Sequence, residues 1–144
     1  IRRHPLMRAL RVDKLTYAAL EATLAEYAAG GGSAAIPVQG MLTMNAEAIR
    51  ARADALVAAI GKVPGWNAQV LKGMSAVGGG SAPGVELQTW LVSIEKDGLS
   101  AAGLEERLRG APVPIIARIE QNRVVMDLRT VAPEDDETLA RLTQ

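Results

Sequence analysis

A tight turn at Gln121-Asn122 constrains the fold of this chain more than any other feature of its sequence. Two segments rich in apolar and β-branched residues, 115–119 and 124–129, flank the turn. Asn adopts positive φ more readily than most residues, so this pair suits a hairpin connection. Because strands joined by a hairpin run antiparallel, the sequence predicts a mainly antiparallel sheet.

Helix and strand signals elsewhere in the chain predict an α+β fold. Asp13 and Asn45 are expected helix N-caps, and Gly61 is expected to end the second helix. Residues 36–42 are expected to form extended coil. The remaining elements are expected as a helix at 14–29, strands at 66–77 and 86–95, a helix at 100–109 and a final helix that begins near Pro133.

The order of these elements is N-terminal helices followed by a β-β-α-β-β-α unit, with the helices packed on one face of the sheet. Arg50, Arg52 and Asp54 are expected on the solvent side of the second helix. The apolar faces of the first two helices are expected at Leu20, Leu24 and Tyr27 and at Ile49, Leu56, Val57 and Ile60.

The composition excludes several kinds of site. Of 144 residues, 49% are hydrophobic and none is Phe, so the core is expected to be built from aliphatic side chains. There is no Cys and one His, which leaves no disulfide, no thiolate nucleophile and no His-based metal centre. The 16 basic and 16 acidic residues cancel, so no global field draws the chain to nucleic acid or to an anionic membrane.

No apolar run approaches the roughly 20 residues that a membrane helix needs. The chain begins at Ile1 rather than Met, and we interpret this as a cut end.

Arg8 and Arg11 are the first candidates for ligand binding. A spacing of three places both guanidinium groups on one side of the chain if the stretch is helical. Two permanently charged side chains suit a dianionic ligand such as a phosphate. The alternative, which spacing alone favours, is a solvated basic face or an ion pair with another part of the protein.

A second candidate is the glycine-rich segment that contains Gly78, Gly79, Gly80 and Ser81. Such a segment lets backbone N–H groups approach an anion closely. It is neither a P-loop nor a dinucleotide fingerprint, because no Gly-Lys-Ser/Thr follows and a strand rather than a helix comes next. The alternative is a flexible connection between two strands.

Other polar residues are weaker candidates. Lys14 lies at a helix start among arginines and is not expected to form a Schiff base, and His4 is expected to pack or to form a hydrogen bond. Residues 134–137 are expected to be helix-end charges rather than metal ligands. Arg118 and Arg129, expected on adjacent strands, either reach an active-site anion or line the solvent face.

Three separated stretches resemble the bacterial selenocysteine synthase family, L-seryl-tRNA(Sec) selenium transferase. They occur in the family's order and span nearly the whole chain. Two positions depart from the family pattern: Gln39-Gly40 stands where an arginine is usual, and Ala117-Arg118 replaces a usual Gly-Arg. The matching stretches are His4-Pro5-Leu6-x-Arg8-Ala9-Leu10-Arg11-Val12-Asp13-Lys14, Val77-Gly78-Gly79-Gly80-Ser81-x-Pro83-Gly84 and Asp127-Leu128-Arg129-Thr130-Val131.

The resemblance implies an aspartate-aminotransferase-like, fold-type I enzyme that uses pyridoxal 5′-phosphate. Its Schiff-base lysine would lie in a large domain, before the equivalent of Ile1, so this fragment alone is expected to hold no catalytic residue and to be inactive. Residues 1–30 would be the end of the large domain with its connecting helix, and residues 31–144 the C-terminal small domain. Arg8 and Arg11 match family arginines that face the active site, and the Gly78–Ser81 segment would border the same cleft.

For the parent protein, the resemblance implies conversion of seryl-tRNA(Sec) to selenocysteinyl-tRNA(Sec), with selenophosphate as the selenium donor. It also implies a cytoplasmic homo-oligomer, a ring of dimers, whose tRNA binding relies on a separate amino-terminal domain. Two alternatives stay open. One is a related lyase that acts on a sugar-acid phosphate, and the other is a non-enzymatic α+β oligomerisation or regulatory module.

Overall fold

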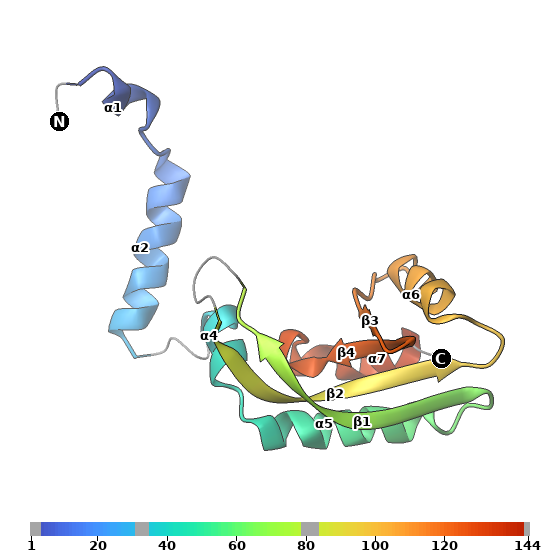
Figure 1. Ribbon diagram of the computed structural model, residues 1–144. Coiled ribbons are helices and arrows are strands. Elements are labelled where there is room, and N and C mark those ends of the chain that lie inside the picture. The colour runs from blue at the N-terminus through green and yellow to red at the C-terminus, as the bar shows by residue number, and fades with distance from the viewer. Residues whose placement is uncertain (1–3, 31–34, 79–83, 143–144) are drawn as a thin grey trace. The chain divides into compact units, whose positions relative to one another are not determined.

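The computed structural model describes residues 4–30, 35–78 and 84–142 (Figure 1). These residues divide into two compact units, Ile1–Thr43 and Met44–Gln144, which are described separately below. None of the helices in the described part of the chain is both long enough and apolar enough to cross a membrane.

The described part of the first unit includes the helices α1 (Leu6–Ala9), α2 (Lys14–Ala28) and α4 (Pro37–Thr43). Asp13 caps α2 as predicted, because its carboxylate accepts hydrogen bonds from the Thr16 N–H at 2.9 Å and from the Thr16 hydroxyl at 3.0 Å. None of the residues of α2 is buried. Its predicted apolar face, Leu20, Leu24 and Tyr27, is therefore about half exposed within this unit.

The prediction of extended coil at residues 36–42 was wrong. Pro37 begins α4 at the first helical position, where its missing N–H costs nothing and its fixed φ favours the helix. The carbonyl of Ile36 accepts hydrogen bonds from the N–H groups of Gln39 and Gly40. The Gln39 amide also donates to the Tyr27 hydroxyl at 2.7 Å, which links α4 to α2 within the first unit.

The second unit is an antiparallel sheet with helices. Its strands are β1 (Trp66–Ala76), β2 (Glu86–Lys96), β3 (Arg118–Glu120) and β4 (Arg123–Asp127), in the spatial order β1-β2-β4-β3. All three pairings are antiparallel, so this prediction is confirmed. The helices are α5 (Ala46–Ile60), α6 (Ala101–Arg109) and α7 (Asp136–Leu142), and two 3-10 turns, Leu128–Thr130 and Pro133–Asp135, precede α7.

Local signals set several element boundaries. The side chains of Asn45 and Ser100 cap α5 and α6, and Gly61 ends α5. Gln121 and Asn122 adopt φ values of 48° and 61°, which fits the two-residue hairpin turn predicted between β3 and β4.

Two predicted strand boundaries were wrong. The strand predicted at 115–119 begins only at Arg118, because the Ile115 N–H donates to the carbonyl of Leu108 at the end of α6 instead of joining the sheet. Arg129 lies in a 3-10 turn rather than in a strand, because the Asp127 side chain accepts a hydrogen bond from its N–H.

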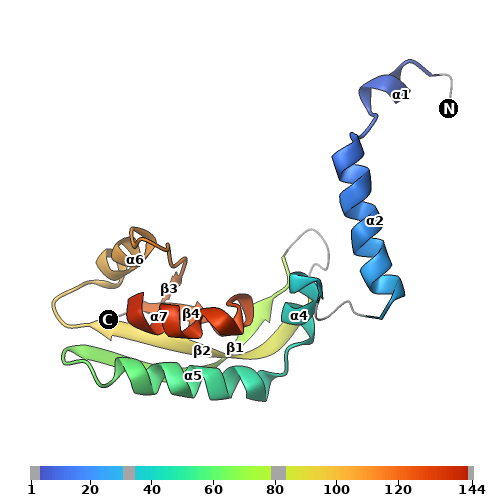
Figure 2. The same ribbon diagram turned by 180° about the vertical axis from the view of Figure 1, so that it is seen from behind.

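The core lies on one face of the sheet, as predicted. Val92 and Ile94 of β2 pair with Met126 and Val124 of β4, so these four side chains share a face. The same buried cluster contains helix residues of α5, α6 and α7, and Figure 2 shows α5 and α7 in front of the strands. The helix residues are Ile49, Ala53, Leu56, Ile60, Ala101, Leu104, Leu108 and Leu139.

Candidate functional site

The predicted anion-binding pair lies in the first unit. Arg8 is in α1, which ends at Ala9, and Arg11 lies beyond that helix. Both residues are exposed. Because the helix stops before Arg11, helical spacing does not set the relative direction of the two guanidinium groups, and their role stays a prediction. His4 forms a hydrogen bond as expected, since its Nδ1 accepts from the Leu6 N–H at 3.3 Å.

The predicted glycine-rich segment is described only at its ends. Gly78 is exposed, whereas Gly79, Gly80 and Ser81 lie outside the described residues. The Val77 N–H donates to the carbonyl of Val85 at 3.1 Å, so the β1–β2 pairing continues to the base of the segment. Gly84 has a φ of +78°, a backbone conformation that glycine adopts without strain.

A polar cluster that sequence reasoning missed lies close to this base. The Asp127 carboxylate accepts hydrogen bonds from the Ser75 hydroxyl at 2.5 Å, from the Thr89 hydroxyl at 2.9 Å and from the Arg129 N–H at 3.0 Å. Ser75 and Thr89 are buried. The cluster joins β1, β2 and β4 at the end of the sheet where the glycine-rich segment begins.

The buried side chain of Arg129 also belongs to this cluster. Only 5% of the residue is exposed, and its guanidinium donates to the Ser75 hydroxyl at 3.0 Å, to the Met44 carbonyl at 2.9 Å and to the Gln88 carbonyl at 2.6 Å. Neither predicted location, a solvent face or an open anion site, matches these contacts. Arg129 instead fixes Met44, where the second unit begins, to the sheet.

Arg52 has a comparable structural role, and its predicted place on the solvent side of the helix was wrong. Its side chain is 14% exposed and forms a bidentate ion pair with Asp136, at 2.7 Å and 2.6 Å. It also donates to the carbonyls of Leu128 and Val131 at 3.0 Å and 2.8 Å. One side chain on α5 therefore holds the whole segment that leads into α7.

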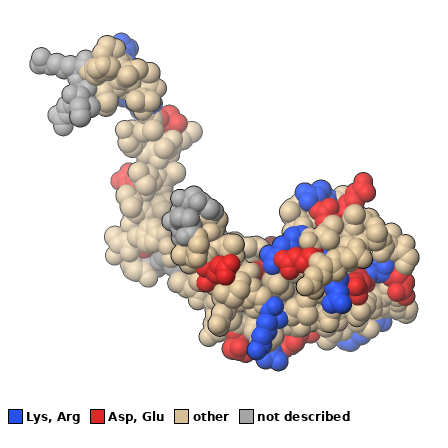
Figure 3. Space-filling view, viewed as in Figure 1, with Lys and Arg blue, Asp and Glu red and all other residues tan. Residues whose placement is uncertain are grey.

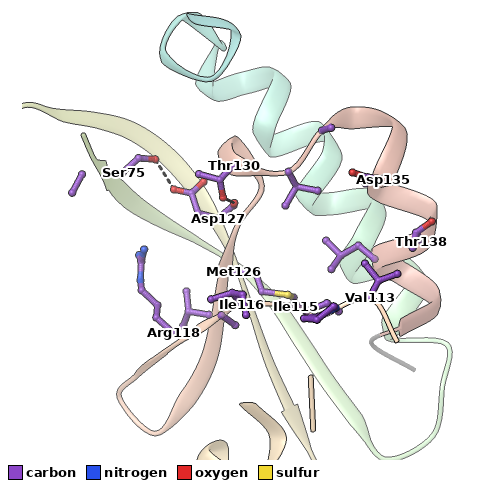
Figure 4. Close-up of a pocket in the computed structure, with 17 residues that line it drawn as sticks. Ser75, Val113, Ile115, Ile116, Arg118, Met126, Asp127, Thr130, Asp135 and Thr138 are labelled. Atoms are coloured by element: carbon purple, nitrogen blue, oxygen red, sulfur yellow. Dashed lines mark hydrogen bonds between the residues drawn. The ribbon is translucent and has the colours of Figure 1, made fainter. Parts of the chain in front are cut away.

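A cleft of about 630 Å³ opens beside the free part of the β4 edge. Its lining comes from the end of β1, from residues 113–118, from β4, and from the turns and helix that follow (Figure 4). Because β3 pairs with β4 only as far as Arg118, the segment before β3 is displaced from the sheet and forms one wall. The apolar part of the lining includes Val113, Ile115, Ile116, Val125, Met126 and Leu139.

The polar groups of the cleft differ between its two sides. Arg118 lines one side, with a side chain that is 46% exposed and that pairs with Glu120 through Nε. Asp127, Thr130, Asp135 and Thr138 contribute oxygen atoms elsewhere in the lining (Figure 4). The described lining of the cleft thus combines one cation, two carboxylates, several hydroxyl groups and a set of aliphatic side chains.

No lysine is positioned for covalent cofactor chemistry in this cleft. The four lysines are Lys14, Lys62, Lys72 and Lys96, and none of them is among the described residues that line it. Lys72 and Lys96 instead lie over the rings of Trp90 and Trp66, at 5.6 Å and 5.0 Å from the ring centres. The described lining of this cleft therefore contains no amine that could form a Schiff base with pyridoxal phosphate.

Charge on the second unit is mixed. Figure 3 shows Lys and Arg interspersed with Asp and Glu over its visible face, without an extended patch of one sign. Several of these charges are paired at the surface, including Arg50 with Asp54 at 3.7 Å and Arg123 with Glu95 at 3.4 Å. Within the residues that the structure describes, no group of three or more His, Asp or Glu side chains is placed to hold a metal ion.

Comparisons with known proteins agree on one family. The family model of L-seryl-tRNA selenium transferase (SelA) matches residues 1–132. L-seryl-tRNA(Sec) selenium transferase of Aquifex aeolicus (strain VF5) is 41% identical over 144 residues, which are all of this chain and 32% of that protein. The proteins of the same name from Geobacter sulfurreducens and Alkaliphilus oremlandii are 41% and 43% identical, over 94% and 98% of this chain.

The chain spans about a third of the length of these curated relatives, since it covers 30% of the Geobacter protein and 31% of the Alkaliphilus protein. The match nevertheless extends through both units, from the segment with Arg8 and Arg11 to the turn after β4. The chain therefore belongs to the L-seryl-tRNA selenium transferase family.

Proposed function

We propose that this chain is the C-terminal part of an enzyme that converts seryl-tRNA(Sec) to selenocysteinyl-tRNA(Sec) with selenophosphate as the selenium donor. The observation that carries the proposal is the family match over residues 1–132, together with relatives of that name at 41–43% identity. These relatives favour a selenium transferase over a lyase that acts on a sugar-acid phosphate. They also favour an enzyme fragment over a free-standing oligomerisation module.

The cofactor of the parent enzyme is pyridoxal 5′-phosphate, which would supply an electron sink for the removal of a proton and a β-hydroxyl group from the seryl moiety. Its lysine lies outside this chain in our proposal. Lys14, Lys62 and Lys72 are exposed, and Lys72 and Lys96 lie over tryptophan rings, which supports that assignment. The fragment alone is then inactive.

Arg8 and Arg11 have the role of binding an anion, either the selenium donor or the phosphate that it releases. Both side chains lie on a unit that buries none of the residues of α1 or α2, so they are available to a pocket formed with the rest of the parent enzyme. A guanidinium group keeps its charge at every physiological pH and can hold a phosphate oxygen with two parallel hydrogen bonds. The Gly78–Ser81 segment borders the same pocket in this proposal.

The parent enzyme is a cytoplasmic ring of dimers in this proposal, and most of its contact with tRNA comes from a domain outside the chain. The mixed charge of the second unit supports a tRNA-binding domain outside the chain, because binding to a phosphate backbone needs a concentration of Lys and Arg.

The full-length enzyme with Arg8→Ala and Arg11→Ala together tests the role of the pair. Selenium transfer to seryl-tRNA(Sec) should fall about a hundredfold or more, because removal of charge-assisted contacts to an anion costs several kcal/mol. Absorbance of the bound cofactor should be unchanged. The double variant Arg107→Ala and Arg109→Ala is the control, since these arginines lie on α6 in the other unit. Wild-type turnover in the Arg8 and Arg11 variant would refute the assignment.

A further inference from the structure

The cleft beside β4 carries a combination of surfaces that fits a nucleotide. We propose that in the parent enzyme this cleft receives the unpaired 3′ end of the tRNA substrate. The inference rests on the proposed function, because the ligand class follows from the substrate of that reaction. It adds a binding site on the second unit, apart from the predicted anion site of Arg8 and Arg11.

An exposed aliphatic wall is the first feature that supports a nucleotide. Val113 and Ile116 are 56% and 67% exposed, and they face the cleft together with the largely buried Met126. Exposed side chains of this size at a cleft wall gain from contact with an apolar ligand. The flat face of an unpaired base is such a ligand, and enzymes that bind unstacked bases hold them between apolar or aromatic side chains.

The distribution of charge is the second feature. Arg118 is the only Lys or Arg among the described lining residues. Glu120 contacts its guanidinium group through Nε, so a phosphate could still bind to the two terminal nitrogens. Figure 4 draws Arg118 and Asp135 on different sides of the cleft, with Ile115, Ile116 and Met126 between them.

Carboxylate and hydroxyl oxygens on the other side can accept hydrogen bonds from base amino groups and ribose hydroxyls. Thr130 and Asp135 supply these oxygens, whereas the Asp127 carboxylate is already held by Ser75, Thr89 and the Arg129 N–H. A bare phosphate or a fatty acid has an anion but lacks a donor for the Asp135 carboxylate. A nucleotide has the anion, the donors and the flat apolar face together.

Size and location are consistent with the end of a strand rather than a duplex. A volume of about 630 Å³ lies within the usual range of small-ligand pockets and is too small to admit a double helix. Ser75 and Ala76 at the end of β1 border the cleft, and the chain passes from there into the glycine-rich segment. In the proposed function Gly78, two residues beyond Ala76, borders the active site, so a 3′ end held here would lie close to the place where its seryl group reacts.

Binding of two forms of uncharged tRNA(Sec) to the full-length enzyme tests the inference. One form is intact and the other lacks the unpaired 3′-terminal nucleotides. Arg118→Gln and Ile116→Ser should each weaken binding of intact tRNA about tenfold, which is the effect of losing one base or phosphate contact. Neither substitution should change the binding of the truncated form. Both side chains are exposed, so neither change should unfold the protein.

Two matched controls come from the same unit. Arg109 is an exposed arginine paired with one glutamate, Glu105, and Ile119 is an isoleucine that is 45% exposed. Neither lines the cleft, so Arg109→Gln and Ile119→Ser should bind both tRNA forms as wild type does. The inference is overturned if the cleft variants bind intact tRNA normally, or if they weaken both forms equally. Conversion of seryl-tRNA(Sec) by the wild-type enzyme is measured separately. If the wild-type enzyme converts it, the proposed function stands even when the binding results overturn the inference about the cleft.

Discussion

Replacement of Arg52 by Met should destabilise the second unit far more than the same replacement of Arg50. The two arginines lie two residues apart on α5, but their surroundings differ. The Arg52 side chain is 14% exposed and holds Asp136 and two backbone carbonyls, whereas the Arg50 and Asp54 side chains are 49% and 58% exposed. Arg50 adds one contact with the Trp90 ring at 4.4 Å.

The magnitudes follow from these contacts. Loss of Arg52 leaves a half-buried carboxylate without its partner and two carbonyls without their donors, so the free energy of unfolding should fall by about 3 kcal/mol. Loss of Arg50 removes an exposed ion pair and an exposed cation–π contact, so it should cost about 1 kcal/mol. The predicted difference of about 2 kcal/mol is large beside the total stability of a small domain.

Urea unfolding of the 144-residue chain, followed by far-ultraviolet circular dichroism, measures both variants. The transition midpoint of Arg52→Met should be clearly lower than that of Arg50→Met, with the same dependence on urea concentration. A double-mutant cycle with Asp136→Asn should give a coupling energy above about 1 kcal/mol for Arg52 and none for Arg50. Equal losses of stability in the two single variants would refute the structural role of Arg52.

Two further predictions concern a helix cap and a close contact. Hydrogen bonds from the Thr16 N–H and hydroxyl lower the pKa of the Asp13 carboxyl, so the cap stabilises α2 above the ordinary pKa of an aspartate and is lost as the pH falls through the lowered value. In NMR titrations the Thr16 amide shift should follow this lowered pKa and should lose its pH dependence in Asp13→Asn; a midpoint at or above the ordinary value would contradict the cap. Gly73→Ala should destabilise the sheet by about 1–3 kcal/mol, because a Cβ there would lie 2.7 Å from Leu91 Cγ and closer still to Cδ1. The double variant Gly73→Ala and Leu91→Ala should show non-additive losses in thermal unfolding, and strict additivity would exclude the clash.

Local signals predicted most of the fold. Asp13, Asn45 and the Gln121-Asn122 turn each act through contacts with near neighbours in the chain, so their effect can be read without tertiary structure. The helix at Pro37 was not predicted, although proline is well tolerated at the first helical position.

The tertiary roles of Arg52 and Arg129 were beyond sequence reasoning. Their carbonyl partners lie between 41 and 85 residues away in the chain, and a charged residue on a helix or strand is exposed in most proteins. The cleft was missed for the same reason, because its walls come from four separate segments. Spacing alone made Arg8 and Arg11 candidates for anion binding but favoured a solvated basic face, and only the family resemblance implied that they face an active site; their role stays a prediction.

The reaction of the full-length wild-type enzyme with seryl-tRNA(Sec) and selenophosphate tests the central claim most directly. Mass spectrometry of the aminoacyl group released from the tRNA identifies the product. We predict selenocysteine in place of serine. Unchanged serine, together with release of ammonia from a sugar-acid phosphate by the same preparation, would contradict the assignment to selenium transfer.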